Sequence, residues 1–360
     1  MNCPYRLTDL MNILIVKMSA VGDVIHTLPA VNALRDHFPG ARITWLVEEA
    51  ASDIVRSHKA VDRVLISKRK KWLKGLGLSG SERLESVKGI SSFIRELRDT
   101  EYDLVIDFQG LLKSAVMVAL SRGKRKLGYD KTREFSYIVL NDRVPQFDMD
   151  KHAIFRYLNL IKHVGVNCEN IRFDVPFGEK ERSEMSSILR RGGWNSEPLV
   201  SVSPMAKWNT KLWETGKFST LADKLIEETG CFVVFTGDVA DREEIKKIVS
   251  GMQRKCLDIS GQTDLKHLAA LYEMSQCVLS TDSGAMHLAA AAGSPVVALF
   301  GPTAPWRTGP FGEGHEVLRA GLPCSPCFKK KCDTVACMRR ISVEQVLAAI
   351  RRTLKRSSVA

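Results

Sequence analysis

The sequence lacks several features that mark common functional classes. No apolar run among its 360 residues reaches the ~20 that a membrane span needs, and the longest, residues 288–300, is interrupted by Gly293 and Pro295. No G-x-G-x-x-G follows the first apolar run, and no G-x-x-x-x-G-K-[ST] occurs. These absences disfavour a dinucleotide oxidoreductase and a P-loop phosphotransferase.

The amino-terminal residues 1–10 also lack the basic start and long apolar core of a signal peptide. We therefore expect them to be a tail or a start-site artefact, the protein to be cytoplasmic, and its cysteines to be reduced.

Cationic side chains exceed anionic ones. The chain has 53 Lys and Arg against 41 Asp and Glu, a formal net charge of +12. A basic protein attracts anions, which include nucleic acid, an anionic membrane and phosphorylated substrates. Charge alone does not choose among them. The length, with 44% apolar residues, predicts two folded domains.

Short apolar runs alternate with segments of helical periodicity along the whole chain. The run at residues 12–16 is typical of a parallel strand covered on both faces. The alternation pauses at a charged helix near 179–190 and then restarts, which predicts two Rossmann-like domains of α/β class, at 11–175 and 176–340. We expect the amphipathic helix within 341–360 to pack back toward the first domain. Ligands of such sheets bind beyond the carboxyl ends of the strands, so a central cleft between the domains is expected.

The segment Thr281–His287 joins an expected strand to an expected helix. Ser283 and Gly284 lie at the helix start, where backbone N–H groups and the helix dipole attract an anion. Asp282 can accept hydrogen bonds from sugar hydroxyls, and His287 lies one turn further on. An ordinary helix cap uses the same residue types, so both interpretations stay open.

A second polar loop, residues 203–213, also follows an expected strand. Its Ser203, Lys207, Thr210 and Lys211 suit a phosphate-bearing donor. A departing diphosphate needs its charge neutralised by a metal or by cationic side chains. No D-x-D carboxylate pair lies near this loop, so lysine is the expected device, and a solvated basic loop is the alternative.

The loop after the first strand contributes one carboxylate. Asp23 follows Gly22 at the start of the helix expected at 24–38. A carboxylate in that position can serve as the general base that removes a proton from an attacking hydroxyl. Spacing alone favours a helix cap.

These segments together resemble one family. The chain is similar to the bacterial lipopolysaccharide heptosyltransferases from Met11 to about Leu354. Trp45–Glu49 and Asp107–Ser114 favour the heptosyltransferase I branch. The segments that carry the resemblance, in order, are Gly-Asp-Val-Ile-His-Thr-Leu-Pro at 22–29, Lys-Leu-Trp at 211–213, Asp-Ser-Gly-Ala-Met-His at 282–287 and Val-Ala-Leu-Phe-Gly-Pro-Thr at 297–303.

The resemblance implies a GT-B fold and an inverting, metal-independent transfer of heptose from ADP-heptose. The acceptor would be Kdo on lipid A, in the inner core of lipopolysaccharide. Asp23 would be the catalytic base, and Lys211 would bind the donor diphosphate. Asp241 would take the acidic position that contacts the adenosine ribose. The residues implied to hold the heptose and phosphates are Asp282, Ser283, Gly284 and His287.

An acceptor bearing Kdo carboxylates and lipid A phosphates requires cationic partners. A basic cluster at 68–74 suits such an acceptor, or the inner face of the inner membrane that bears it. A solvated basic loop is the alternative. No nucleic-acid motif with interleaved aromatics occurs, so no nucleic-acid partner is expected. The predicted acceptor-binding residues are Lys68, Arg69, Lys70, Lys71, Lys113 and Arg133.

Four cysteines cluster near the end of the chain, at Cys324, Cys327, Cys332 and Cys337. Their spacing is compatible with a structural zinc or an iron–sulfur cluster. Four reduced thiols, or an occasional disulfide, are the alternatives, and no catalytic metal is predicted. Two rival functions stay open: another GT-B nucleotide-sugar enzyme, such as a different core heptosyltransferase or a 2-epimerase, and a zinc and nucleic-acid binding module.

Overall fold

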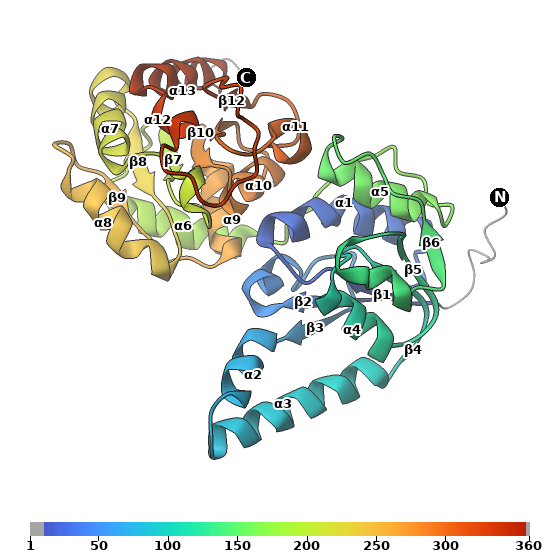
Figure 1. The fold of residues 1–360 in the computed structure, drawn as a ribbon. Coiled ribbons are helices and arrows are strands. Elements are labelled where there is room, and N and C mark those ends of the chain that lie inside the picture. Colours follow the sequence, from blue (N-terminus) through green and yellow to red (C-terminus); the bar gives the residue numbers. More distant parts are fainter. Residues whose placement is uncertain (1–10, 358–360) are drawn as a thin grey trace. The chain divides into compact units, whose positions relative to one another are not determined.

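The computed structural model describes residues 11–357. The start-site prediction for residues 1–10 lies outside them. The chain forms two units that divide between Pro176 and Phe177, one residue from the expected boundary. Each unit contains a six-stranded sheet in which every strand pairing is parallel. The α/β class is therefore confirmed (Figure 1).

Unit 1 alternates strands with helices, where η denotes a 3₁₀-helix. Helices α1 and α5 pack together, and α3 contacts both α2 and α4. The elements are β1 (Asn12–Val16), α1 (Val21–His37), β2 (Arg42–Glu48), η1 (Glu49–Ile54), β3 (Arg63–Ser67), α2 (Arg69–Leu76), α3 (Ser81–Arg98), β4 (Glu101–Asp107), α4 (Leu112–Leu120), β5 (Arg122–Tyr129), η2 (Arg133–Val139), β6 (Asp142–Val144) and α5 (Ala153–Lys162).

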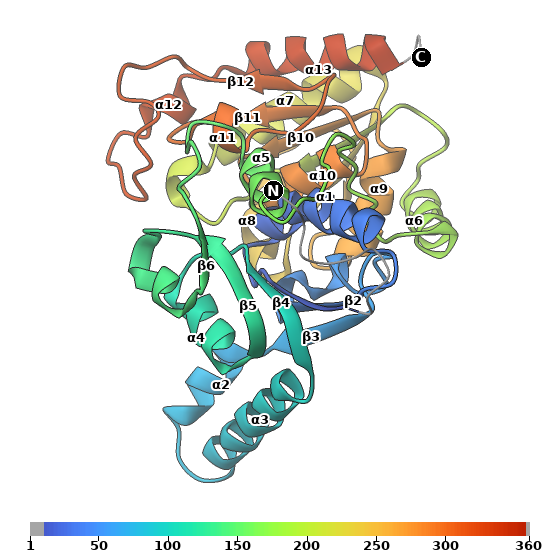
Figure 2. The ribbon, with the colours of Figure 1, turned by 90° about the vertical axis from the view of Figure 1, so that its right-hand side faces the viewer.

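Unit 2 repeats the alternation, and Figure 2 shows α7 and α13 on one side of its sheet with α9 and α10 on the other. The elements are α6 (Glu179–Arg191), β7 (Leu199–Ser203), η3 (Asn209–Lys211), α7 (Thr215–Thr229), β8 (Phe232–Phe235), η4 (Val239–Asp241), α8 (Arg242–Ser250), β9 (Leu257–Asp258), α9 (Leu265–Met274), β10 (Cys277–Thr281), α10 (Gly284–Ala291), β11 (Val296–Leu299), α11 (Pro305–Thr308), β12 (Glu316–Leu318), α12 (Ala336–Arg339) and α13 (Val343–Ser357).

The strand order places a ligand-binding edge in each unit. The orders are β3-β2-β1-β4-β5-β6 and β12-β11-β10-β7-β8-β9. In each sheet the chain winds outward in both directions from one central pair, β1 with β4 in unit 1 and β7 with β10 in unit 2. Loops leaving the carboxyl ends of such a pair diverge and open a crevice, which is where doubly wound sheets bind ligands.

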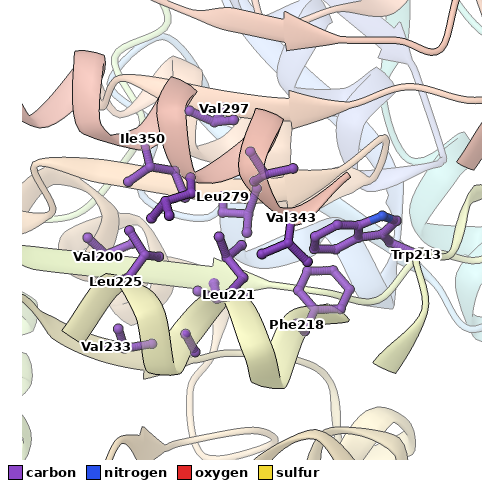
Figure 3. Close-up of a cluster of buried hydrophobic side chains, with 14 of the residues drawn as sticks. Val200, Trp213, Phe218, Leu221, Leu225, Val233, Leu279, Val297, Val343 and Ile350 are labelled. Carbon is purple, nitrogen blue, oxygen red and sulfur yellow. The ribbon is translucent and has the colours of Figure 1, made fainter. Parts of the chain in front are cut away.

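The last helix belongs to the core of unit 2. Helix α13 lies on the sheet of unit 2 and against α7, and its expected packing toward the first domain stays a prediction. Its Ile350 is fully buried in the unit 2 core together with Leu221 and Leu279 (Figure 3). Val346 of the same helix is also fully buried. The amphipathic pattern correctly indicated that one face is covered. It carried no information on which surface covers that face, because many apolar surfaces accept the same stripe.

Candidate functional site

Strands β7 and β10 bring the two polar loops of unit 2 together. Ser203, the last residue of β7, pairs in register with Ser280 of β10. The next residues of β10 and its loop are Thr281 and Asp282, both buried. The Thr281 hydroxyl donates to the carbonyl of Met205 at 3.0 Å and so joins the loops directly. The segments predicted separately from the sequence are thus parts of one site.

Lys211 and Asp282 form the charged centre of this site. Their Nζ and Oδ2 atoms are 2.7 Å apart, and the side chains are only 16% and 5% exposed. The Thr303 hydroxyl donates to the same Asp282 oxygen at 2.5 Å. Sequence reasoning did not select Thr303, although it ends the Val-Ala-Leu-Phe-Gly-Pro-Thr segment. Strand β11, which pairs with β10, places it there.

An aromatic ring supports the cationic side of the site. The Lys211 ammonium lies 4.6 Å from the centroid of the Trp208 ring, and that of Lys330 lies 5.1 Å from it. Such contacts between a cation and a ring are attractive and orient the ammonium groups. Lys330 was not predicted. Thr210, predicted to bind phosphate, is buried, and its hydroxyl donates to the carbonyl of Lys329 at 2.9 Å.

The remaining predicted donor residues lie on α10 and in the loops after β7 and β8. Ser283 is the N-cap of α10, Gly284 its first residue, and His287 is buried one turn into the helix. Lys207 is exposed in the β7 loop. Asp241 accepts a hydrogen bond from the backbone N–H of Asp238 at 2.9 Å, so it organises the loop after β8.

In unit 1 a buried hydrogen-bonded chain ends at Asp23. The Lys17 ammonium donates to the Tyr157 hydroxyl at 2.8 Å, and that hydroxyl donates to Asp23 Oδ1 at 3.3 Å. Asp23 Oδ2 accepts from the backbone N–H of Ala20 at 3.2 Å. The Asp23 carboxylate is therefore oriented by both ends of the loop before α1 and by α5.

The pKa values of Lys17 and Tyr157 both depend on the Asp23 carboxylate. Burial by itself would lower the pKa of Lys17, but the Asp23 carboxylate and the Tyr157 hydroxyl outweigh it and raise that pKa. Burial raises the pKa of Tyr157, and the Asp23 carboxylate adds to the effect. Lys17 is thus cationic and Tyr157 is a neutral donor at physiological pH. Neither residue was predicted. Tyr157 is distant from Asp23 in sequence, so the sequence alone does not bring the two together.

The predicted acceptor-binding cations divide into two groups. Lys113 and Arg69 converge on Glu48 Oε1, at 3.0 and 3.4 Å. The Lys113 ammonium also donates to the hydroxyl of Ser19, in the same loop that precedes Asp23. Lys68 lies 3.7 Å from Glu49. The remaining residues are exposed, Lys70 and Lys71 on α2 and Arg133 on η2.

The four clustered cysteines are free thiols in the structure. Within residues 11–357, no three His, Cys, Asp or Glu side chains lie close enough to hold a metal ion. Cys324 and Cys332 are exposed, while Cys327 and Cys337 are half-buried. The Cys332 sulfur contacts the Thr334 hydroxyl at 3.7 Å instead. The structural-zinc prediction therefore finds no ligand set here.

Among residues 11–357, none of the helices combines the length and the apolar character of a membrane span.

Known proteins share both sequence and architecture with this chain. The model of glycosyltransferase family 9 (heptosyltransferase) matches residues 90–337. Lipopolysaccharide heptosyltransferase 1 of Pseudomonas aeruginosa is 30% identical over 336 residues, which cover 89% of this chain and 87% of that protein. The same-named protein of Escherichia coli is 28% identical over 313 residues, 86% of this chain and 94% of its own length.

Solved structures agree. The E. coli heptosyltransferase WaaC with ADP matches with a TM-score of 0.75 and 25% identity, over 95% of this chain and 100% of that chain. A family 9 glycosyltransferase from Veillonella parvula matches with a TM-score of 0.81 and 22% identity, over 97% of this chain and 98% of its own. The predicted GT-B fold is confirmed.

Proposed function

The chain belongs to glycosyltransferase family 9, the heptosyltransferases, and from this premise we propose that it transfers heptose from ADP-heptose to the Kdo of the lipopolysaccharide inner core. Membership of an enzyme family replaces the alternative of a zinc and nucleic-acid binding module. The enzyme would act in the cytoplasm, peripherally at the inner face of the inner membrane.

The observation that carries the donor half of the proposal is the Lys211–Asp282 pair beside the start of α10. A diphosphate placed there meets the Lys211 ammonium and the backbone N–H groups at Ser283 and Gly284. Asp282, already in contact with the Thr303 hydroxyl, is placed to accept hydrogen bonds from the heptose. Phosphate and Asp282 share one lysine, so donor binding and sugar positioning are coupled.

The proposed chemistry is a single displacement with inversion at the anomeric carbon. The acceptor hydroxyl oxygen forms a bond to that carbon, and the bond from the carbon to the β-phosphate oxygen breaks. The hydroxyl proton passes to Asp23, and ADP leaves with the electron pair of the broken bond. Lys211 stabilises the charge on the departing diphosphate, and no step requires a metal. General-base removal of the proton contributes about 10²–10⁴-fold in such reactions.

The test is a transfer assay with defined substrates. The protein is incubated with ADP-heptose and Kdo-bearing lipid A, and the product is examined for the mass of one added heptose. Product is expected from the wild type, and absence of product with every inner-core acceptor would refute the proposal. A 2-epimerase would instead convert the donor without an acceptor, which the same spectra and donor chromatography reveal.

Two variants separate the roles of base and donor residue. Asp23→Asn is expected to lose transfer by 10²-fold or more while still binding ADP-heptose in calorimetry. Lys211→Met is expected to weaken both binding and transfer. The matched control is Asp36→Asn on the same helix, since Asp36 pairs with Arg172 at the surface. Near-wild-type transfer by Asp23→Asn would show that the base is another group.

A further inference from the structure

Four large apolar side chains are exposed on two adjoining elements of unit 1. Leu112 and Val116 belong to α4 and are 58% and 44% exposed. Phe135 and Ile138 belong to η2 and are 71% and 64% exposed. We call these four residues the α4–η2 surface. Leaving so much apolar area in water is unfavourable, at about 25 cal/mol per Å², and contiguous exposed patches mark interaction sites.

The four side chains lie on two elements that pack together. Helix α4 packs against η2, and the backbone N–H of Leu112 donates to Glu134 Oε2 at 2.8 Å. This bond ties the start of α4 to η2 at the residue before Phe135. Val116 follows Leu112 by one helical turn, so these two lie on the same side of α4, and Phe135 and Ile138 are both exposed on η2.

The backbone holds Phe135 outward at a cost. Glu134 and Phe135 have φ angles of 60° and 56°, in the left-handed region that non-glycine residues rarely adopt. Directly after them, Ser136 is buried and its hydroxyl lies 2.5 Å from that of Thr132. A strained turn anchored by buried neighbours is not a frayed loop. Strain of this kind persists where the surroundings impose it, often at functional sites.

Cationic side chains border the apolar patch. Lys131 and Arg133 are exposed in the segment that leads into Phe135, which also carries the exposed Glu134. An apolar centre with a basic border fits an anionic lipid surface, which takes up apolar side chains and attracts cations. A second copy of this chain is a poorer occupant, because it would bring Lys131 and Arg133 against identical charges.

We propose that the α4–η2 surface contacts the anionic lipid layer in which the acceptor is embedded. The inference rests on the proposed function, because a lipid-linked acceptor gives unit 1 a reason to meet a membrane. Phe135 and Ile138 enter the interface between headgroups and acyl chains, while Lys131 and Arg133 remain among the lipid phosphates. The occupant is therefore a bilayer rich in anionic phospholipid.

Vesicle sedimentation tests the surface without donor or acceptor. Wild-type protein is mixed with vesicles of phosphatidylcholine and phosphatidylglycerol, or of phosphatidylcholine alone. Binding to the anionic vesicles is expected, and Phe135→Ser/Ile138→Ser should weaken it about tenfold. The matched control is Trp306→Ser/Val317→Ser in unit 2, on α11 and β12, where the side chains are 47% and 40% exposed. The control should bind as the wild type does. Loss in the control with retention in Phe135→Ser/Ile138→Ser would overturn the assignment.

A second measurement separates this inference from the proposed function. With a deacylated, soluble Kdo acceptor, Phe135→Ser/Ile138→Ser should transfer heptose at the wild-type rate. With acceptor embedded in anionic vesicles, it should be slower in proportion to its weaker binding. Equal rates on vesicles would overturn the membrane contact even if heptose transfer is confirmed. A wild-type dimer that the double substitution converts to monomer, without vesicle binding by either, would assign the surface to a second copy.

Discussion

Replacing Tyr157 by phenylalanine removes one oxygen from the buried chain that orients Asp23. The ring and its edge-on contact with Phe108 remain, with centroids 5.8 Å apart. The Lys17 ammonium keeps the carbonyl of Phe108 at 3.3 Å but loses the hydroxyl at 2.8 Å. Lys17 is only 3% exposed, so water does not freely replace the lost partner.

Two magnitudes follow from this geometry. One N–H of the buried Lys17 ammonium left without a partner costs about 1–3 kcal/mol, which lowers the melting temperature of a unit this size by roughly 2–12 °C. The 3.3 Å bond to Asp23 is a weaker contact, for which about 0.5–1.5 kcal/mol is typical. That range corresponds to a fall in kcat of about 2- to 13-fold, with the KM for ADP-heptose unchanged because the proposed donor residues lie in unit 2.

The assay combines thermal denaturation with steady-state transfer kinetics. Tyr129→Phe is the matched control, since its hydroxyl donates to the carbonyl of Arg156 at 2.6 Å and accepts from Asn159 at 3.1 Å. This control should lose stability but keep kcat. If Tyr157→Phe melted and turned over as the wild type does, the orienting role of the chain would be refuted. If kcat fell equally for Tyr129→Phe, the loss of activity in Tyr157→Phe would be attributed to general destabilisation of unit 1.

Four further outcomes are expected. Lys211→Met should lower kcat/KM by about 100-fold, whereas Lys217→Met on α7 should leave it within about twofold, as paired transfer assays can check. Exhaustive chelation before the assay should leave the transfer rate unchanged. Leu225→Ala, in the fully buried core of unit 2, should lower the free energy of unfolding by about 2–5 kcal/mol in denaturant titrations. Burial by itself lowers the pKa of His267, but Glu184 and Asp264 outweigh it and raise that pKa above 6.5. The stabilisation of the fold by the His267 charge is therefore complete below pH 6.5 and is lost as the pH rises through the raised pKa. The difference in melting temperature between wild type and His267→Gln should accordingly shrink from about pH 5 to pH 9.

Local patterns were sufficient to predict the architecture. A strand covered on both faces needs consecutive apolar residues. Strands such as β1 can therefore be recognised in the sequence without knowing which strands they pair with. The loops after these strands were correctly placed at the carboxyl edge of each sheet, because parallel strands all end on the same side. Asp23, Lys211 and Asp282 could therefore be named from sequence and resemblance, and their chemical roles remain proposals.

Contacts between distant segments could not be predicted in this way. Tyr157 reaches Asp23 from α5, and Thr303 reaches Asp282 from the loop after β11. Both depend on the strand order and on which helix covers which face. The spacing of the four cysteines suggested a metal site, but spacing does not determine the direction in which each side chain points. The structure leaves Cys332 exposed and beside Thr334.

The amino-acid sequence by itself determined two parallel α/β units and the polar loops at their carboxyl edges, because strand burial and helix periodicity are properties of short segments. Only the tertiary structure decided that α13 completes the core of unit 2, that Lys17 and Tyr157 orient Asp23, and that Phe135 faces solvent. Each of these depends on which surfaces meet after folding. An apolar or charged side chain specifies the kind of partner it needs, and the packing of the whole unit selects which one it finds.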